Sequence, residues 1–323
     1  MYFSPGIKNK LNDFFNFEAL REELKDAIQD KNMPMIALYG LRRTGKTSLI
    51  RVVLNALKLK YVWLDGRDIS SRENFNIKLK EEINRLKLIK LDKVAIKGVE
   101  IKFDSRNDLD FLNRKKVVLV IDEAQLLKRY GIDNKLAYIY DNFPHIKIII
   151  SGSEIGMLES FLGKNNARAP LYGRAVLEIK TYKLDTEYAR RFLLEGAKQA
   201  NRIISESELK VATESFGGII GWLTKYGWYR LKVNHQIALE KTTEEGKVIA
   251  KEEFLKFAFR AESRYLAILQ AVQTGARWEE IKKAVAISDS QLNAMLNRLK
   301  DHGFIEKIDH HYVIADPLLA AAL

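Results

Sequence analysis

The sequence predicts an α/β protein with a parallel-sheet core, a helical part after it, and a C-terminal domain that combines helices with two short strands. Three observations support this prediction. In residues 1–182, short apolar runs alternate with helical patterns, which is typical of βαβ units. In residues 183–251, strand patterns nearly vanish. Residues 252–323 then show three helical patterns followed by a hairpin pattern.

The expected core elements follow one another in a regular order. Helical patterns occupy residues 16–31 and 72–89, and a further helical stretch runs to residue 143. Residues 98–103 are either a short strand or half of a hairpin. The core strands are expected within residues 33–40, 60–68, 115–122, 145–154 and 175–180.

A glycine-bracketed loop follows the first expected strand. Residues 37–54 read ALYGLRRTGKTSLIRVVL, so Gly40 and Gly45 enclose four residues, and Lys46 and Thr47 come next. This is the spacing of a P-loop, whose backbone N–H groups point at phosphate oxygens. The lysine reaches and neutralises the terminal phosphates, the threonine hydroxyl can bind Mg²⁺, and the positive end of the next helix faces the anion. The residues expected to contact the nucleotide are Gly40, Leu41, Arg42, Arg43, Thr44, Gly45, Lys46, Thr47 and Ser48.

Two acidic residues complete the expected chemistry. Asp122 and Glu123 end the third core strand, after a run of apolar residues. Asp122 and Thr47 together can hold Mg²⁺, and Glu123 can orient or deprotonate the attacking water. Ser151 and Ser153 end the next strand, where Ser153 is placed to sense the γ-phosphate or to position the water; a simple turn is the alternative. The pair of acids is typical of ATP-hydrolysing enzymes with an AAA+-like P-loop NTPase core.

The nucleotide is expected to be ATP rather than GTP. A guanine site would need a motif of the N-K-x-D type. Asn134 and Lys135 begin such a motif, but the nearest following aspartate, Asp141, is too far along the chain. We therefore expect ATP and Mg²⁺ as cofactors.

Composition limits the remaining function classes. The chain has 323 residues and no cysteine, which excludes disulfides and thiolate metal sites. No apolar run is long enough to span a bilayer, and the first fifteen residues lack the layout of a signal peptide, so we expect a cytoplasmic protein without a membrane partner. The net charge is +12 and the pI about 9.5. Such an excess indicates an anionic partner such as nucleic acid, or simply a lysine-rich surface.

The C-terminal residues have the pattern of a winged helix. Helices are expected at residues 264–273, 278–286 and 289–301, with Ser288 as the N-cap of the third and Gly303 after its end. A hairpin with its turn at residues 309–310 forms the wing. In DNA-binding proteins of this plan, the third helix enters the major groove.

The third helix carries outward polar residues that suit DNA. Asparagine and glutamine read adenine, while arginine and lysine read guanine or bind phosphate. A protein-docking role with an ordinary solvated face is the alternative. The candidate DNA contacts are Gln291, Asn293, Asn297, Arg298 and Lys300.

Taken together, these residues resemble the archaeal ATPases, P-loop proteins related to AAA+ and to the STAND signalling ATPases. The resemblance covers nearly the whole chain and implies an ATPase core, a helical lid and a winged helix. It also implies that Arg174 contacts either a γ-phosphate or a partner, with a loop salt bridge as the alternative. The matching segments are GLRRTGKTS, LVIDEAQ, SGSEIGML, PLYGRA at 170–175 and GGIIGWLTKYG at 217–227.

Two positions depart from the family pattern. The family commonly reads G-G-I-P-G in the lid, with the proline near the adenine in STAND relatives, whereas Ile220 stands at that place here. The family often has an Arg-Glu pair near the N-terminus, whereas Phe17 precedes Glu18 here. The resemblance therefore leaves the phosphate site intact but predicts a different lid contact.

We expect a core over residues 1–182, a lid over 183–251 and a winged helix over 252–323. The polar residues 241–251 are expected to begin a linker before the winged helix. ATP hydrolysis would move the lid and, with it, the winged helix, on DNA. Two other interpretations remain open. One is a nucleotide-gated DNA-binding regulator with little hydrolysis, and the other is a signalling scaffold whose winged helix binds protein.

Overall fold

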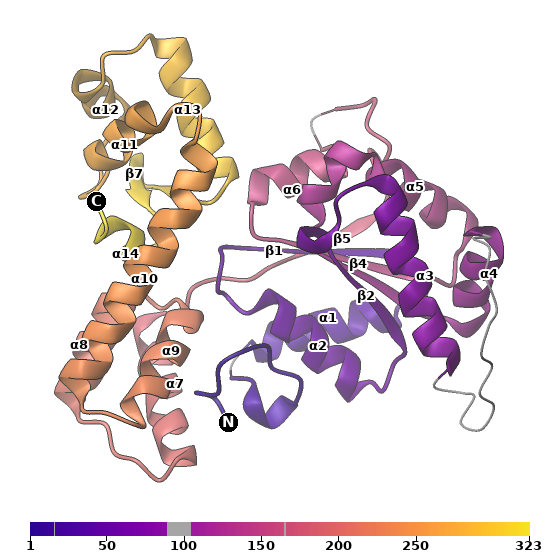
Figure 1. Ribbon diagram of the computed structural model, residues 1–323, viewed down its shortest axis with the longest axis horizontal. Coiled ribbons are helices and arrows are strands. Elements are labelled where there is room, and N and C mark those ends of the chain that lie inside the picture. Colours follow the sequence, from indigo (N-terminus) through magenta and orange to yellow (C-terminus); the bar gives the residue numbers. More distant parts are fainter. Residues whose placement is uncertain (16, 89–104, 165) are drawn as a thin grey trace.

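A five-stranded parallel sheet forms the centre of the core (Figure 1). The computed structural model describes residues 1–15, 17–88, 105–164 and 166–323, so the strand or hairpin expected at 98–103 lies outside the described residues. The strands lie in the order β2-β3-β4-β1-β5, and each neighbouring pair is parallel. Their bounds are β1 Met35–Tyr39, β2 Tyr61–Asp65, β3 Val118–Asp122, β4 Lys147–Gly152 and β5 Val176–Lys180.

Helices cover both faces of this sheet because successive strand residues point to opposite sides. Ile36 and Leu38 of β1 pack with α1 and α2, whereas Met35 and Ala37 pack with α3, α4, α5 and α6 on the other face. The predicted α/β P-loop core is confirmed. The core helices are α1 Glu18–Gln29, α2 Lys46–Ala56, α3 Arg72–Leu88, α4 Ser105–Lys115, α5 Ile132–Asn142 and α6 Ile155–Leu162, with short 3-10 helices η1 Leu11–Asp13, η2 Gly66–Asp68 and η3 Ala124–Tyr130.

The strand order determines where the loops meet. Because all five strands are parallel, their carboxyl ends lie at one edge of the sheet, where ligands bind in folds of this kind. β4 separates β1 from β3, so Gly152 lies beside Tyr39, and Asp122 ends the strand on the far side of β4. The P-loop, the acidic pair and the Ser151–Ser153 segment therefore share one edge.

The lid is a group of helices beside the core: α7 Thr186–Gln199, α8 Glu206–Phe216, α9 Ile220–Arg230 and α10 His235–Ala258 (Figure 1). The linker expected at residues 241–251 is wrong, because this polar segment lies inside α10. Ala238, Thr242, Gly246 and Ala250 recur at every fourth position and are buried, so they form one continuous face that packs on α9 and α14.

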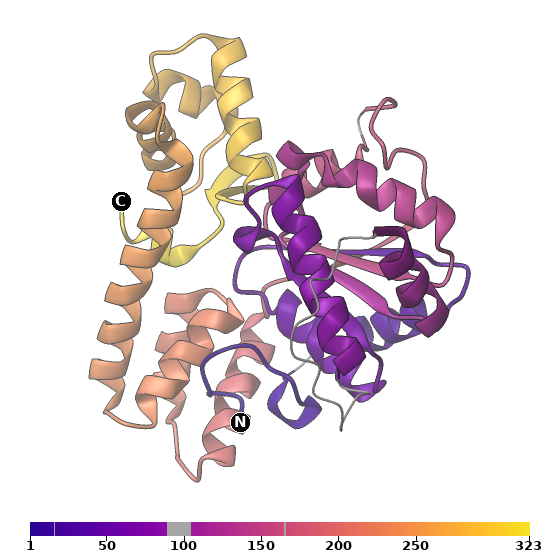
Figure 2. The ribbon, with the colours of Figure 1, turned by 45° about the vertical axis from the view of Figure 1, so that its right-hand side comes forward.

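The C-terminal domain is the predicted winged helix. It consists of α11 Glu262–Ala271, α12 Trp278–Ala284, α13 Asp289–Asp301, β6 Ile305–Ile308, β7 His311–Ile314 and α14 Pro317–Ala320. Ser288 caps α13 through a reciprocal capping box with Gln291, as the sequence indicates. The tip of the antiparallel wing lies at residues 309–310, where both φ angles are positive. Figure 2, which shows the ribbon from another side, places α13 close to α6 of the core, and these two helices are in contact.

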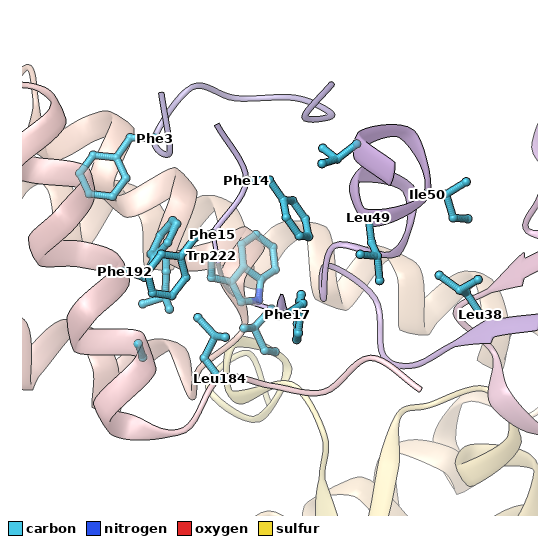
Figure 3. Packing of buried hydrophobic residues seen from close by; sticks show 14 of the residues in the cluster. Phe3, Phe14, Phe15, Phe17, Leu38, Leu49, Ile50, Leu184, Phe192 and Trp222 are labelled. Carbon is cyan, nitrogen blue, oxygen red and sulfur yellow. The ribbon is translucent and has the colours of Figure 1, made fainter. Parts of the chain in front are cut away.

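The N-terminal segment ties the lid to the core. Phe3 packs against Gly196 of α7 and Gly227 of α9, where any side chain would overlap its ring. Phe14, Phe15 and Phe17 continue this apolar contact toward the core, together with Phe192 and Trp222 of the lid (Figure 3). No helix among the described residues combines the length and apolar character that a bilayer span requires.

Candidate nucleotide and hydrolysis site

The P-loop has the tight backbone that its glycines predict. Gly45 has a φ of 91°, a value that residues with a side chain rarely adopt, and it precedes the first residue of α2. A side chain at Gly40 would overlap Thr181, which follows β5. The Thr181 hydroxyl lies 2.7 Å from that of Thr44, and the Thr44 hydroxyl also donates to the Leu41 carbonyl at 2.8 Å. These contacts hold the loop against the sheet.

Lys46 is folded back onto its own loop. Its Nζ donates to the Gly40 and Leu41 carbonyl oxygens at 2.8 and 2.7 Å, and only 6% of the residue is exposed. Burial lowers the pKa of Lys46 to about 8, and the charges of Glu123 and Asp122 offset this only in part. A phosphate group would take the place of the two carbonyl acceptors.

Asp122 and Thr47 lie together under the loop. The Thr47 hydroxyl donates to Asp122 Oδ2 at 2.9 Å, and the Ser151 hydroxyl donates to Oδ1. Asp122 is 1% exposed, and burial raises the pKa of its carboxyl. A hard cation prefers such oxygen donors, and the cation would compensate the buried negative charge. The two predicted metal ligands are therefore adjacent and of the right chemical type.

Glu123 and Ser153 are also in direct contact. One oxygen of Glu123, Oε2, accepts from the Ser153 backbone N–H at 3.1 Å and from its hydroxyl at 2.9 Å. Gln125 Nε2 donates to the same oxygen at 2.6 Å. Gln125 ends the segment LVIDEAQ, but no motif in the sequence gives it a role.

A cavity of about 880 Å³ is lined by Lys46, Thr47, Glu123, Gln125 and Ser153 and extends to the lid and the N-terminal segment. This volume suits a nucleotide. Glu123, Lys46 and Thr47 line one end, and Ile220 of α9 and Phe14 line the part toward the lid. Further lining residues are Gly6, Ile7, Lys8, Ser48, Arg67, Thr224 and Trp228.

The two departures from the family pattern have separate outcomes. Ile220 lines the cavity, so an apolar lid contact is retained at this place. Phe17 is 1% exposed and packs edge-on against Tyr182. Its ring therefore belongs to the apolar contact between lid and core rather than to the cavity wall.

A family model for the ATPase domain found predominantly in Archaea matches residues 14–226. The chain belongs to this family. The resemblance inferred from the sequence is confirmed: the chain carries an archaeal-type ATPase domain, and this family supports binding of ATP. A second model, for the C-terminal winged helix-turn-helix domain of MCM proteins, matches residues 260–314.

Solved structures and curated relatives agree with this assignment. The Walker-type ATPase of Pyrococcus abyssi is 29% identical with a TM-score of 0.89, over 100% of this chain and 99% of that one. The ORC2 protein of Aeropyrum pernix, in complexes with ADPNP and ADP, is 12% identical with a TM-score of 0.63, over 99% and 94% of the two chains, and shares the fold.

Two relatives are similar in sequence. An uncharacterised ATP-binding protein of Pyrococcus horikoshii is 27% identical over 250 residues, 66% of this chain and 74% of that protein. An uncharacterised protein of Methanocaldococcus jannaschii is 24% identical over 307 residues, or 91% of this chain. The ATPase chain spans 62% of the length of that relative.

The ATPase should bind ATP more weakly as the pH rises above 8. A bound phosphate should raise the pKa of Lys46. Above pH 8, where Lys46 is mostly neutral in the free protein, the side chain must therefore take up a proton when ATP binds. Affinity is therefore highest below the free pKa of about 8 and falls by up to about tenfold per pH unit above it. Titrations with fluorescent ATP at several pH values measure this. Lys46→Arg, which stays charged, should have a flatter profile, and equal slopes in both proteins would contradict the assignment.

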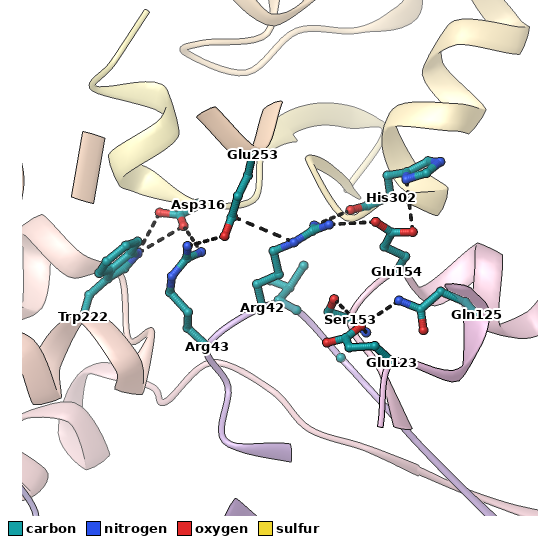
Figure 4. A network of polar contacts seen from close by, with 12 residues as sticks. Arg42, Arg43, Glu123, Gln125, Ser153, Glu154, Trp222, Glu253, His302 and Asp316 are labelled. Carbon is teal, nitrogen blue, oxygen red and sulfur yellow. Dashed lines mark hydrogen bonds and ion pairs between the residues drawn. The ribbon is translucent and has the colours of Figure 1, made fainter. Parts of the chain in front are cut away.

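Arg42 and Arg43, whose contact with nucleotide stays a prediction, also bind residues of the core, of α10 and of the winged helix (Figure 4). Arg42 donates to the His302 carbonyl and to Glu154, each at 2.8 Å. Arg43 donates to Glu253 at 2.6 Å. Their guanidinium groups point out of the loop, although both residues also border the cavity. These are contacts between residues more than 100 positions apart, and the motif carries no signal for them.

Asp316 extends this network. It lies 3.7 Å from Arg43, and it accepts from the Trp222 indole N–H at 3.0 Å. The guanidinium of Arg43 also stacks 4.2 Å above the Trp222 ring. Burial raises the pKa of the Asp316 carboxyl, while the nearby Arg43 charge opposes that shift. Core, lid and winged helix therefore meet at one arginine of the P-loop.

The structure does not bring Arg174 to the cavity. Its guanidinium donates to both carboxylate oxygens of Asp141, at 3.1 and 2.6 Å, and lies over the Tyr140 ring. Arg174 is not among the residues that line the cavity within the described part of the chain. The predicted contact of Arg174 with a γ-phosphate or with a partner stays a prediction.

The outward face of α13 is partly engaged within the ATPase itself. Gln291 closes the capping box, and the Asn293 side-chain oxygen accepts from the Trp278 indole at 2.8 Å. Arg298 lies over the rings of Phe257 and Tyr265. Asn297 and Lys300 are exposed, as are the other three. The buried face consists of Leu292, Met295, Leu296 and Leu299, as predicted.

Proposed function

We propose that this ATPase hydrolyses Mg²⁺-ATP and uses the nucleotide state of its P-loop to hold or release the winged helix. The geometry of Asp122 and Thr47 supports a magnesium site, since two oxygen donors lie adjacent in a buried, negative position. When bound, Mg²⁺ supplies positive charge to the phosphates. Lys46 neutralises the terminal phosphates.

Hydrolysis in this proposal needs one proton acceptor. Water attacks the γ-phosphorus, the bond to the bridging oxygen breaks, and Glu123 takes the proton that the water loses. Ser153 donates to Glu123 through two groups and faces the same cavity, so it is placed to respond to the γ-phosphate. The products are ADP and phosphate.

The contact of Arg42 and Arg43 with the winged helix is the observation that supports coupling. Phosphate binding must draw Lys46 away from the Gly40 and Leu41 carbonyls, which changes the loop that carries both arginines. Leu41 and Gly303, which follows α13, also line one small pocket between the P-loop and the winged helix. A change in the loop therefore acts directly on the docked winged helix.

Distance measurements between two labels test this coupling. The chain has no cysteine, so Lys115→Cys on α4 and Lys283→Cys on α12 give one labelled pair at exposed positions. In a Glu123→Gln background, Mg²⁺-ATP should shift the distance distribution by several ångströms, and ADP should restore the starting distribution. Arg42→Ala with Arg43→Ala should give the shifted distribution without nucleotide. A distribution that never changes with nucleotide would refute coupling and leave a simple ATPase.

DNA is the proposed partner of the winged helix, but the charge distribution limits how it binds. Residues 252–323 contain nine lysines and arginines and ten aspartates and glutamates, so the net charge of +12 arises in the residues before them. A duplex held by α13 should therefore also contact the core or the lid. The likeness to an MCM winged helix-turn-helix domain supports a nucleic-acid role for this domain.

Salt dependence of duplex binding by the full chain tests the DNA proposal. Each phosphate contact contributes about −0.9 to the slope of log affinity against log salt. Arg298→Ala with Lys300→Ala should weaken binding and flatten the slope by up to about 2. The matched control, Arg298→Lys with Lys300→Arg, keeps both positive charges and should leave the salt slope unchanged. Absence of binding at low salt would favour the alternative, a docking module for protein on a cytoplasmic signalling ATPase.

A further inference from the structure

Gln125 is a buried polar side chain in direct contact with Glu123. It is 4% exposed, lies in η3 just after the acidic pair, and borders the nucleotide cavity. Its Nε2 donates to Glu123 Oε2 at 2.6 Å, the shortest of the three hydrogen bonds to that oxygen. Its own Oε1 is buried without a hydrogen-bond donor from any described residue. An apolar side chain would avoid that unsatisfied oxygen, so the amide is unfavourable for stability alone.

The surroundings fix the orientation of this amide. A side chain at Gly152 would overlap Gln125 Oε1, so the end of β4 leaves room for the amide only because position 152 is glycine. The amide cannot be turned over usefully, because its oxygen would then face the Glu123 carboxylate. Gln125, Ser153 and Glu123 point toward one another beside the cavity (Figure 4).

We propose that Gln125 is a positioning residue for hydrolysis, acting through Glu123. Three donors, one from Gln125 and two from Ser153, converge on Oε2 of Glu123. Oε1 of Glu123 accepts no hydrogen bond from the described residues. Oε2 of Glu123 is therefore the oxygen that is held in place, and Oε1 of Glu123 is the oxygen that receives the proton of the water. Ser153 supplies two donors from one side of the carboxylate, and Gln125 supplies a third from the other side. Donors on both sides stop the carboxylate from rotating about its last bond. This inference rests on the proposed role of Glu123 as proton acceptor.

The test separates turnover from nucleotide binding and from stability. Gln125→Met keeps the length of the side chain and removes both the donor and the unsatisfied oxygen. We expect kcat to fall by on the order of tenfold, the ATP KM to stay within about twofold, and Tm to stay equal or rise. Gln125→Glu should lower kcat further, because it places a second carboxylate against Glu123. Gln270→Met, at an exposed position on α11, is the matched control and should change none of the three quantities.

A double-mutant comparison decides whether Gln125 acts through Glu123. In a Glu123→Gln background, measured by single-turnover hydrolysis, adding Gln125→Met should cause no further loss. Full additivity, or an unchanged kcat in both single variants of Gln125, would overturn the inference. A lower kcat that is matched by an equal rise in KM and a fall in Tm would also overturn it, in favour of a packing role. If Glu123→Gln turns over like the wild type, the proposed role of Glu123 itself fails.

Discussion

Lys46→Ala should abolish ATP binding while the protein remains folded. Lys46 is the one flexible cation that the P-loop directs at the terminal phosphates, and the charged hydrogen bonds it makes there are of the strong kind. In the free protein its Nζ is buried against two carbonyl oxygens, so removing it also removes an unfavourably buried charge. Affinity for fluorescent Mg²⁺-ATP should fall by about two orders of magnitude or more, with thermal unfolding as the check on folding.

The matched control for this substitution is Lys60→Ala, which removes an exposed lysine before β2. It should leave both affinity and unfolding unchanged. Wild-type affinity in Lys46→Ala would place the nucleotide elsewhere in the chain.

Glu123→Gln should retain Mg²⁺-ATP but lose turnover by ~10²-fold or more, the usual scale for removal of a general base. The amide has nearly the same shape, so the hydrogen bonds from Ser153 and Gln125 to its oxygen can persist. Phosphate release measures turnover, and equilibrium binding of fluorescent ATP measures retention. A turnover rate equal to that of the wild type would mean that another group accepts the proton.

The same variant is useful as a trap. If ATP stays bound without hydrolysis, partners that recognise the ATP state should remain associated. A pulldown with Glu123→Gln, compared with one using Lys46→Ala, then reports DNA or protein that depends on bound ATP.

The phosphate site could be predicted from the sequence because its chemistry is encoded locally. The spacing of Gly40, Gly45 and Lys46 requires one backbone shape, and Asp122 marks the end of a buried strand beside it. Secondary structure in the winged helix was predictable for the same reason, since Ser288 is a residue type that commonly caps a helix and marks the start of α13. In such places a few neighbouring residues determine the geometry.

Contacts between distant segments were not predictable in this way. Arg42 fits the motif as a nucleotide contact, yet its partner His302 lies 260 positions away. Gln125 carries no signal until Ser153 and Gly152 are placed beside it by the parallel pairing of β3 and β4. The predicted linker failed for a related reason. Residues 241–251 are polar on their exposed side, and the small buried residues of α10 pack on α9 and α14, elements that the local pattern does not reveal.

The continuity of α10 has a mechanical consequence. One uninterrupted helix of 24 residues joins the lid to the winged helix, which makes it a stiff rod about 36 Å long. A rod converts a small angle at one end into a large travel at the other, so a tilt of about 10° would carry the far end through about 6 Å. The closure of the lid around a molecule as small as ATP would thus be amplified to the scale of a DNA groove. Two prolines placed on the exposed side of α10 would act as a joint in this lever, leaving hydrolysis intact but uncoupling it from the travel of the winged helix.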